Sequence, residues 1–231
     1  MAHIEKHKRV QAIAKKVLDQ IGETLSPSDS ERTIADRACR MLAELGVNET
    51  WYYDCMAYVL AGPRTCLSIS GKDYVPAEDE IGPTSLVTID LSPSLNGTWG
   101  DHARSFFIED GMATHHPRSP EFKRGREVLT RLHGSVLLCA KPDMTFERLW
   151  SITSSQLQSM KFESLDFLGN FGHTIESELS ARSYIESGNR RLLGDTELFT
   201  FEPHIKSLDG TWGFKYEEIY YFNEDGNAWI L

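Results

Sequence analysis

Two aspartates have the type and spacing of residues that bind a cation together. Asp90 lies in the apolar segment "LVTIDLS", and Asp101 follows the turn residues Asn96-Gly97. Because the flanking segments can pair about that turn, the two carboxylates are near-opposite and can converge on one side. Two buried carboxylates that lie side by side repel each other unless they share a proton or a cation. The segment therefore predicts a cation-binding position.

The second half of the chain offers the same arrangement with longer acids. Glu202 lies in "FTFEP" and Glu217 in "FKYEEIYYF", on either side of Asp209-Gly210, and His173 lies in the glycine-flanked "GNFGHTIE". Any one of these acids alone would be interpreted as a surface or salt-bridged carboxylate. Together, four buried carboxylates need several positive charges, which two divalent metals supply. Oxygen ligands with one imidazole suit Mn, Fe, Co or Zn.

Helices and hairpins are the elements that would position these side chains. Apolar residues recur at helical spacing from Val10 to Ile21, and a second helix is predicted between a cap at Ser28 or Ser30 and Gly46. "WYYDCMAYVLAG" and "LVTIDLS" predict strands. "LNGTW" predicts a tight hairpin, because Asn-Gly readily adopts the positive φ angles of a type I′ turn. "DHARSFFIE" is then the return strand.

Two independent motifs repeat at nearly the same offset. "SLNGTWG" begins at Ser94 and "SLDGTWG" at Ser207. The pair Glu31-Arg32 recurs as Glu147-Arg148. Both offsets indicate a duplicated unit of about 110–115 residues, which is too long for a solenoid repeat. We therefore expect one domain over residues 1–231, built from half-repeats at roughly 8–112 and 121–226, with helices packed on one continuous sheet.

Composition excludes several classes of function. The 231 residues include 24 basic and 34 acidic ones, a net charge of −10, which argues against binding nucleic acid through phosphate neutralisation. No apolar stretch is long enough to span a bilayer, and "MAHIEKHKRV" has no secretory signal, so a cytoplasmic protein without membrane partners is expected. The cysteines show no metal-binding spacing and are expected to be reduced thiols: Cys39, Cys55, Cys66 and Cys139.

The order of these motifs resembles that of the pita-bread metallopeptidases, peptidase family M24. "VTIDLSPSLNGTWGDHARSFF" resembles the family's I-D-x-G, N-G and D-x-x-R-[ST]-F, with Ser92 where glycine is usual. "GHTI", "FTFEPH" and "KYEEIYYFNEDG" resemble its later motifs. The family includes methionine aminopeptidase, aminopeptidase P and prolidase, with creatinase as a non-metal relative. The resemblance implies an α+β pita-bread fold, in which two pseudo-twofold-related αα-β-hairpin halves form one curved antiparallel sheet covered by helices.

The resemblance also implies roles for the five residues. Asp90 and Asp101 would hold one metal, His173 and Glu202 the other, and Asp101 and Glu217 would bridge both. A hydroxide between two divalent metals would attack an amide or peptide carbonyl, with Glu202 as the catalytic proton shuttle. Only about 85 residues precede the first ligand strand, so the resemblance implies a short form without the N-terminal domain of prolidase.

Two substrate-binding histidines of the family are missing. Ser180 stands where the family has a histidine seven residues after the ligand histidine, and "GPRTCLSISGKD" stands where it has another upstream. His102 follows Asp101 and is expected to face away from it, and a loop histidine pair is usually exposed. The residues that we retain as candidates for substrate binding are His102, His115, His116 and Ser180.

Three functions remain open at this point. The first is a dinuclear metal-dependent hydrolase that resembles Xaa-Pro aminopeptidase or dipeptidase and acts on a small peptide or amide-like substrate. The second is a specialised small-molecule metalloenzyme with non-peptidase chemistry, which the missing histidines favour. The third is a non-catalytic binding member, which the complete ligand set disfavours. A homodimer is one option for the oligomeric state.

Overall fold

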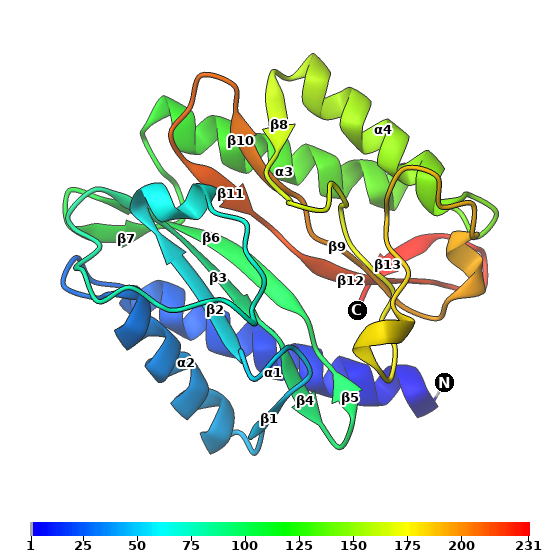
Figure 1. Ribbon diagram of the computed structural model, residues 1–231, viewed down its shortest axis with the longest axis horizontal. Helices are drawn as coiled ribbons and strands as arrows, with labels where there is room; N and C mark the ends of the chain where they lie inside the picture. The colour runs from blue at the N-terminus through cyan, green and yellow to red at the C-terminus, as the bar shows by residue number, and fades with distance from the viewer. Residues whose placement is uncertain (1) are drawn as a thin grey trace.

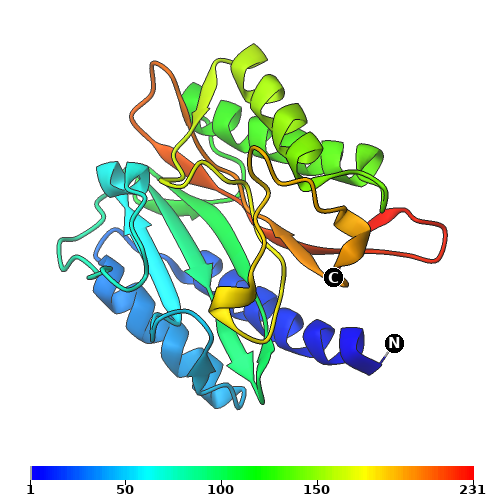
Figure 2. The same cartoon turned by 45° about the vertical axis from the view of Figure 1, so that its right-hand side comes forward.

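A computed structural model describes residues 2–231, in which helices flank a central set of antiparallel strands (Figure 1). The described residues form four α-helices in two pairs: α1 Ala2–Thr24, α2 Glu31–Glu44, α3 Pro120–Cys139 and α4 Phe146–Ser159. In Figures 1 and 2, α1 and α2 lie along one side of the strands, and α3 and α4 lie along the other. None of these helices is both long enough and apolar enough to cross a membrane.

The strands form one larger ladder and three short ones, all antiparallel. The larger ladder has the order β2-β3-β6-β7, and the shorter ones are β1-β4-β5, β11-β10-β8 and β13-β12-β9. In the first half the strands are β1 Glu49–Thr50, β2 Ala57–Ala61, β3 Ser85–Leu91, β4 Pro93–Leu95, β5 Thr98–Trp99, β6 His102–Glu109 and β7 Met112–Thr114. In the second half they are β8 Phe162–Ser164, β9 Phe199–Phe201, β10 His204–Ser207, β11 Gly213–Lys215, β12 Glu218–Phe222 and β13 Ala228–Ile230.

Helix α2 begins where the sequence predicted a cap. Ser30 accepts a hydrogen bond from the Thr33 amide, and the Thr33 hydroxyl accepts one from the Ser30 amide, so Ser30 is the cap. The next residue, Glu31, is buried and makes contacts with other segments in addition to its favourable position at the helix N-terminus. Its carboxylate pairs with Arg64 and accepts the amides of Ala61 and Ala77, which fixes the chain after β2 to the helix.

The two "GTWG" turns differ in the structure. Leu95 pairs with Thr98, and Asn96 and Gly97 have φ of 52° and 74°, so the first tight hairpin is confirmed. In the second repeat, Lys206 pairs with Gly213, so residues 207–212 form a longer loop and the same tight turn is absent there. Helix α3 explains the longer loop. The carboxylate of Glu121 in that helix accepts hydrogen bonds from the amides of Thr211 and Trp212 and holds the loop open.

The strand predicted from Trp51 onward was wrong at its start. The chain turns at Tyr53 and Asp54, which have positive φ, and the strand begins only at Ala57. Trp51 instead stacks on Trp99 of the first hairpin, with ring centroids 4.6 Å apart. The apolar character of this segment therefore serves side-chain packing across the hairpin rather than a strand.

Each half has its own apolar core, and two return strands join them. One buried cluster lies between Ala14 and Ile108, and the other is built mainly from residues of α3, α4 and the later strands. The Glu217 amide donates to the Ala103 carbonyl at 2.9 Å, and the Ser105 hydroxyl bonds both the amide and the carbonyl of Lys215. A helix pair followed by a hairpin thus recurs in the same order in both halves. The limits of the half-repeats, 8–112 and 121–226, and the single domain over residues 1–231 stay predictions.

Candidate metal centre

Three of the predicted acidic ligands lie where a strand is interrupted. Asp101 falls between β5 and β6, Glu202 between β9 and β10, and Glu217 between β11 and β12, whereas Asp90 is the penultimate residue of β3. Because the ladder is broken at these points, the side chains leave the regular alternation and can turn toward one centre. Asp90 pairs directly with Ala103, so it and Asp101 meet diagonally across the hairpin.

A helix residue that the sequence did not single out holds Asp101 in place. Gln11 of α1 is buried, and its side-chain amide donates to the Asp101 carbonyl at 2.7 Å and accepts the Asp101 amide at 2.9 Å. These two bonds replace the ladder bonds that the break at Asp101 removes. The amphipathic pattern of α1 gave no sign of this contact, because a polar residue on an apolar face has many uses.

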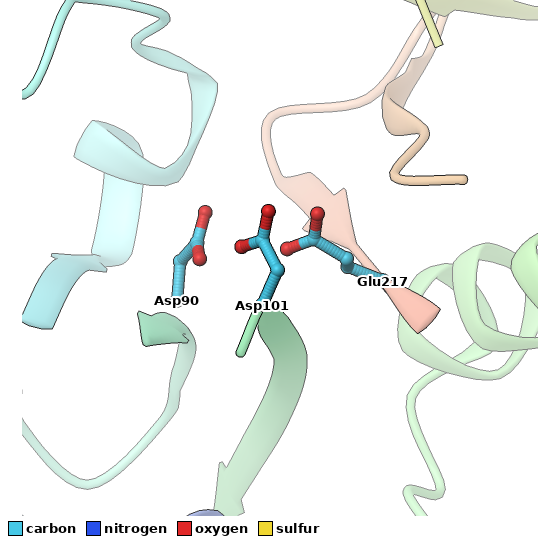
Figure 3. A group of neighbouring side chains, drawn as sticks. All are labelled: Asp90, Asp101 and Glu217. Atoms are coloured by element: carbon cyan, nitrogen blue, oxygen red, sulfur yellow. The ribbon is translucent and has the colours of Figure 1, made fainter. Parts of the chain in front are cut away.

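Three carboxyl groups gather in the centre (Figure 3). Asp90, Asp101 and Glu217 each offer an oxygen within 4.8 Å of the others, and Figure 3 shows them turned to the same side. Among the described residues, Asp101 Oδ2 and both carboxylate oxygens of Glu217 are buried without a hydrogen-bond partner. Such orphaned oxygens are costly unless they share a proton or bind a cation, and hard divalent cations prefer this donor set. The residues therefore fit a metal.

His173 also faces this centre. Its Nδ1 lies 2.9 Å from the Thr174 carbonyl, which places the proton on Nδ1 and leaves the Nε2 lone pair free. Nε2 lies 3.4 Å from Asp101 Oδ2 and 3.6 Å from Glu202 Oε1. Burial lowers the pKa of His173 to about 4, so the imidazole is neutral. A lone pair that faces two carboxylates is repelled by them unless a proton or a cation lies between.

The backbone that presents His173 requires a glycine. Gly172 has φ of 144°, and a Cβ there would lie 2.2 Å from the Thr200 carbonyl oxygen. This close approach lets the Thr200 hydroxyl accept the His173 amide at 3.0 Å. The glycine of the "GH" motif is therefore a steric requirement of the ligand's position.

A lysine that the sequence analysis missed completes the charge pattern. Lys215 Nζ lies 2.5 Å from Asp90 Oδ2 and 3.1 Å from Glu202 Oε2, which joins one acid of each half. Although burial opposes its charge, Asp90 and Glu202 raise the pKa of Lys215 well above its ordinary value. Lys215 precedes Glu217 by two residues, and this spacing on a strand is the one signal that could have pointed to it.

The carboxyl groups divide into two electrostatic types. Burial and the charges of Asp90 and Glu202 raise the pKa of Asp101 well above its ordinary value, and burial and Asp101 do the same for Glu217. Burial also acts on Glu202, but Lys215 and His173 outweigh it and lower the pKa of Glu202. Metal binding at this centre therefore has to release protons from the first type, whereas Glu202 is already ionised.

The centre opens into a cavity of about 350 Å³ with an aromatic wall. The side chains of the metal centre that line it, which we call its floor, are Asp90, Asp101, His173, Glu202 and Lys215. The wall side chains share a large apolar or aromatic surface, and they include Trp51, Tyr52, Tyr53, Tyr58, Phe167, Leu168 and Tyr184. Ser68, Ile69 and Ser70 also lie on the wall, where the related family has its upstream histidine.

The four residues retained for substrate binding do not lie in this cavity. His102 is buried behind the centre, 3.4 Å from Gln11 and 3.6 Å from Glu218. His115 and His116 are exposed, and Ser180 is exposed in the 3₁₀ turn Leu179–Ala181. Their role in substrate binding stays a prediction, and the cavity wall is built from other side chains.

Comparisons with known proteins agree on the fold. The X-Pro aminopeptidase of Thermotoga maritima superposes with a TM-score of 0.81 at 19% identity, covering 99% of this chain and 60% of that chain. The prolidase of Pyrococcus furiosus gives 0.81 at 21%, covering 99% and 63%, and the Xaa-Pro dipeptidase of Bacillus anthracis gives 0.79 at 17%, covering 99% and 60%. This chain thus spans about three fifths of their length. The expected α+β pita-bread fold is confirmed.

Comparison by sequence identifies the family. No curated protein matches the chain. The model of metallopeptidase family M24, in contrast, matches residues 5–224, which is nearly the whole sequence and includes all five predicted ligands. The chain therefore belongs to metallopeptidase family M24.

Proposed function

We propose that this chain is a metal-dependent hydrolase that cleaves an amide or peptide bond in a small substrate. Asp90, Asp101, His173, Glu202 and Glu217 would hold two divalent cations. The observation that carries the proposal is the set of buried, unpartnered oxygens of Asp101 and Glu217, with the free Nε2 of His173 beside Asp101. Membership of family M24 and the resemblance to an X-Pro aminopeptidase and a prolidase support the same chemistry.

The residues of the centre divide the work of hydrolysis. Bound divalent metals would supply an activated water and polarise the substrate carbonyl. Glu202 is ionised and lies at the cavity floor, so its carboxylate can take up a proton and later deliver it to the leaving amine. Lys215 holds Glu202 toward Asp90 and so fixes its orientation. The aromatic wall places apolar surface beside the reacting groups.

A specialised small-molecule reaction is the second candidate. The observation that favours it is the cavity wall, because His102, His115, His116 and Ser180 all lie outside it and aromatic side chains take their place. The loss of a donor to a developing oxyanion typically costs ~10²–10³ in rate. Peptides would then be slow substrates of a centre that still binds metal.

Metal analysis and a peptide panel test both candidates. Protein loaded with Mn, Fe, Co or Zn should contain close to two ions per chain, and Asp101→Asn should lose most of them. Asp79→Asn removes an exposed acid and serves as the matched control. Absence of metal after loading would overturn both candidates. Bound metal with turnover of Xaa-Pro or Met-Xaa peptides would support the first, and bound metal without such turnover would favour the second.

A further inference from the structure

His204 brings into the cavity an imidazole that the proposed hydrolysis does not use. It is the first residue of β10, and it lines the cavity together with the floor. In the ladder it stands directly opposite Lys215 of β11, and the side chains of directly opposite residues lie on the same face of an antiparallel pair. Since Lys215 reaches the floor between Asp90 and Glu202, His204 also projects to the cavity side.

One ring nitrogen of His204 is held by a backbone carbonyl. Nε2 lies 2.7 Å from the Thr65 carbonyl oxygen, which can only accept, so Nε2 carries the proton. Burial and the charge of Lys215 lower the pKa of His204 to about 4, so the ring is neutral. The other nitrogen, Nδ1, is therefore a hydrogen-bond acceptor.

A glycine of the repeated motif sets the position of that carbonyl. Thr65 is buried in the 3₁₀ turn Gly62–Cys66, the cyan turn after β2 in Figure 1, and its hydroxyl accepts the Gly213 amide at 3.0 Å. A Cβ on Gly213 would overlap the Thr65 carbonyl oxygen, so glycine allows β11 to approach the turn this closely. Gly213 is the last residue of "SLDGTWG". The second copy of the motif thus fixes the orientation of the His204 ring.

Nδ1 of His204 is open to the cavity. In the part of the chain that the structure describes, this atom makes no hydrogen bond, and it is not one of the buried polar atoms that lack a partner, so it reaches the space that the residue lines. Two other polar groups of the wall are already engaged. The Tyr58 hydroxyl donates to the Ile69 carbonyl at 3.2 Å, and the Ser68 hydroxyl accepts the Phe167 amide at 3.1 Å. Nδ1 is thus an uncharged acceptor that a ligand can use.

We propose that His204 is a specificity-determining residue whose Nδ1 accepts a hydrogen bond from a hydroxyl group on a side chain of the substrate. A site with such an acceptor disfavours an otherwise identical ligand that leaves the acceptor unpaired. The charge of Lys215 on the same face disfavours a cationic donor such as an ammonium group, so a neutral hydroxyl fits best. The inference rests on the proposed hydrolase, because it assigns the substrate class of that same cavity.

Two variants separate the contact with the substrate from the bond to Thr65. In His204→Gln, the side-chain amide reaches the position of Nε2 and can still donate to Thr65, but nothing takes the position of Nδ1. In His204→Asn, the amide oxygen takes the position of Nδ1, and the bond to Thr65 is lost. His3→Gln, at an exposed histidine of α1, is the matched control.

The probes are pairs of dipeptides that differ by one hydroxyl group. Gly-Tyr is compared with Gly-Phe, Gly-Ser with Gly-Ala, and the reversed sequences likewise. Calorimetry measures their binding to metal-free protein, and reduced-amide analogues, which cannot be hydrolysed, are titrated into metal-loaded protein. In at least one pair, wild type should bind the hydroxyl-bearing probe about 2- to 10-fold more tightly, as one neutral hydrogen bond contributes. His204→Gln should lose this preference, whereas His204→Asn should keep part of it and His3→Gln all of it.

The outcomes separate this inference from the proposed hydrolase. Equal binding within every pair to wild type would overturn the role of His204 and leave the hydrolase standing. A preference kept in His204→Gln and lost in His204→Asn would also overturn it, because His204 would then act only through Thr65. Failure to bind metal would reject the hydrolase, whereas a preference in metal-free protein that His204→Gln alone removes would still support the contact.

Nitrogen NMR of wild type gives a readout that does not depend on the folding of a variant. In ¹⁵N-labelled protein, Nδ1 of His204 should be the unprotonated nitrogen, and its signal should shift with the hydroxyl-bearing member of the preferred pair and not with the other. A protonated Nδ1 in the free protein, or the same shift with both members, would overturn the inference.

Discussion

Replacement of Lys215 by methionine should destabilise the metal-free protein far more than the metal-loaded protein. In the metal-free centre, Lys215 is the cation that lies between Asp90 and Glu202, at 2.5 and 3.1 Å. Methionine has a similar length and no charge, so it leaves two carboxylates beside each other with no cation. Bound divalent cations would supply that charge, and the variant should then lose little.

The structure sets the size of the effect. Removal of one partner of a buried ion pair costs ~3–5 kcal/mol, and the 18% exposure of the Lys215 side chain favours the lower end. In a chain of this length, a loss of ~3 kcal/mol lowers Tm by about 6–12 °C. Lys206→Met is the matched control, because Lys206 pairs with the more exposed Glu163 at 3.1 Å. Its loss should cost no more than ~1 kcal/mol.

The effect should also depend on pH. Lys215 lowers the pKa of Glu202 below its ordinary value of 4.5, so this pair contributes stability above that pH. The contribution is lost as the pH falls through the folded-state pKa of Glu202. The difference between wild type and Lys215→Met in urea denaturation should therefore be largest near neutral pH and shrink in acid. An equal loss with and without metal, or a loss independent of pH, would refute the electrostatic role of Lys215.

Three further perturbations test other contacts. Gly172→Ala should lower the free energy of unfolding, measured by urea denaturation, by at least ~2 kcal/mol and weaken metal binding in titrations, because the added Cβ overlaps the backbone. Gly134→Ala in α3 is the control, because the space around it is open, and it should be neutral or slightly stabilising. Gln11→Leu should lower metal affinity ~10- to 100-fold by freeing the backbone of Asp101, and unchanged affinity would contradict the clamp. Burial lowers the pKa of His133 from 6.5 to about 3, so the stability that it contributes as a neutral group is present above pH 6.5 and is lost as the pH falls toward 3. By linkage, the free energy of unfolding should be ~2 kcal/mol lower near pH 5 than above pH 6.5 because of His133. His133→Phe should flatten that part of the pH profile of urea denaturation.

Local patterns were enough to predict the hairpin and the approach of the acids. The Asn96-Gly97 turn fixes its register within a few residues, so the side on which Asp90 and Asp101 meet follows from the sequence. Glu202 and His173 required the order of the motifs, because no local rule brings segments so far apart together. Their roles as ligands remain predictions that the metal measurements test.

Contacts between distant segments account for what the sequence analysis missed. The second turn looked equivalent to the first, but Glu121 binds the loop and changes its length. Trp51 looked like part of a strand, but it stacks on Trp99 of the first hairpin. Gln11 is an ordinary polar residue of a helix, and its contact with Asp101 depends on the strand break that tertiary packing creates.

Charge balance sets how many cations the metal centre can hold. The neutral His173 adds no charge, and Lys215 offsets one of the four carboxylates. With one divalent cation the centre would keep one negative charge. With the two divalent cations that we propose it would carry one positive charge, which the hydroxide that attacks the substrate would offset. The loaded centre would then be close to neutral although the chain as a whole has a net charge of −10, and this balance favours two cations over one.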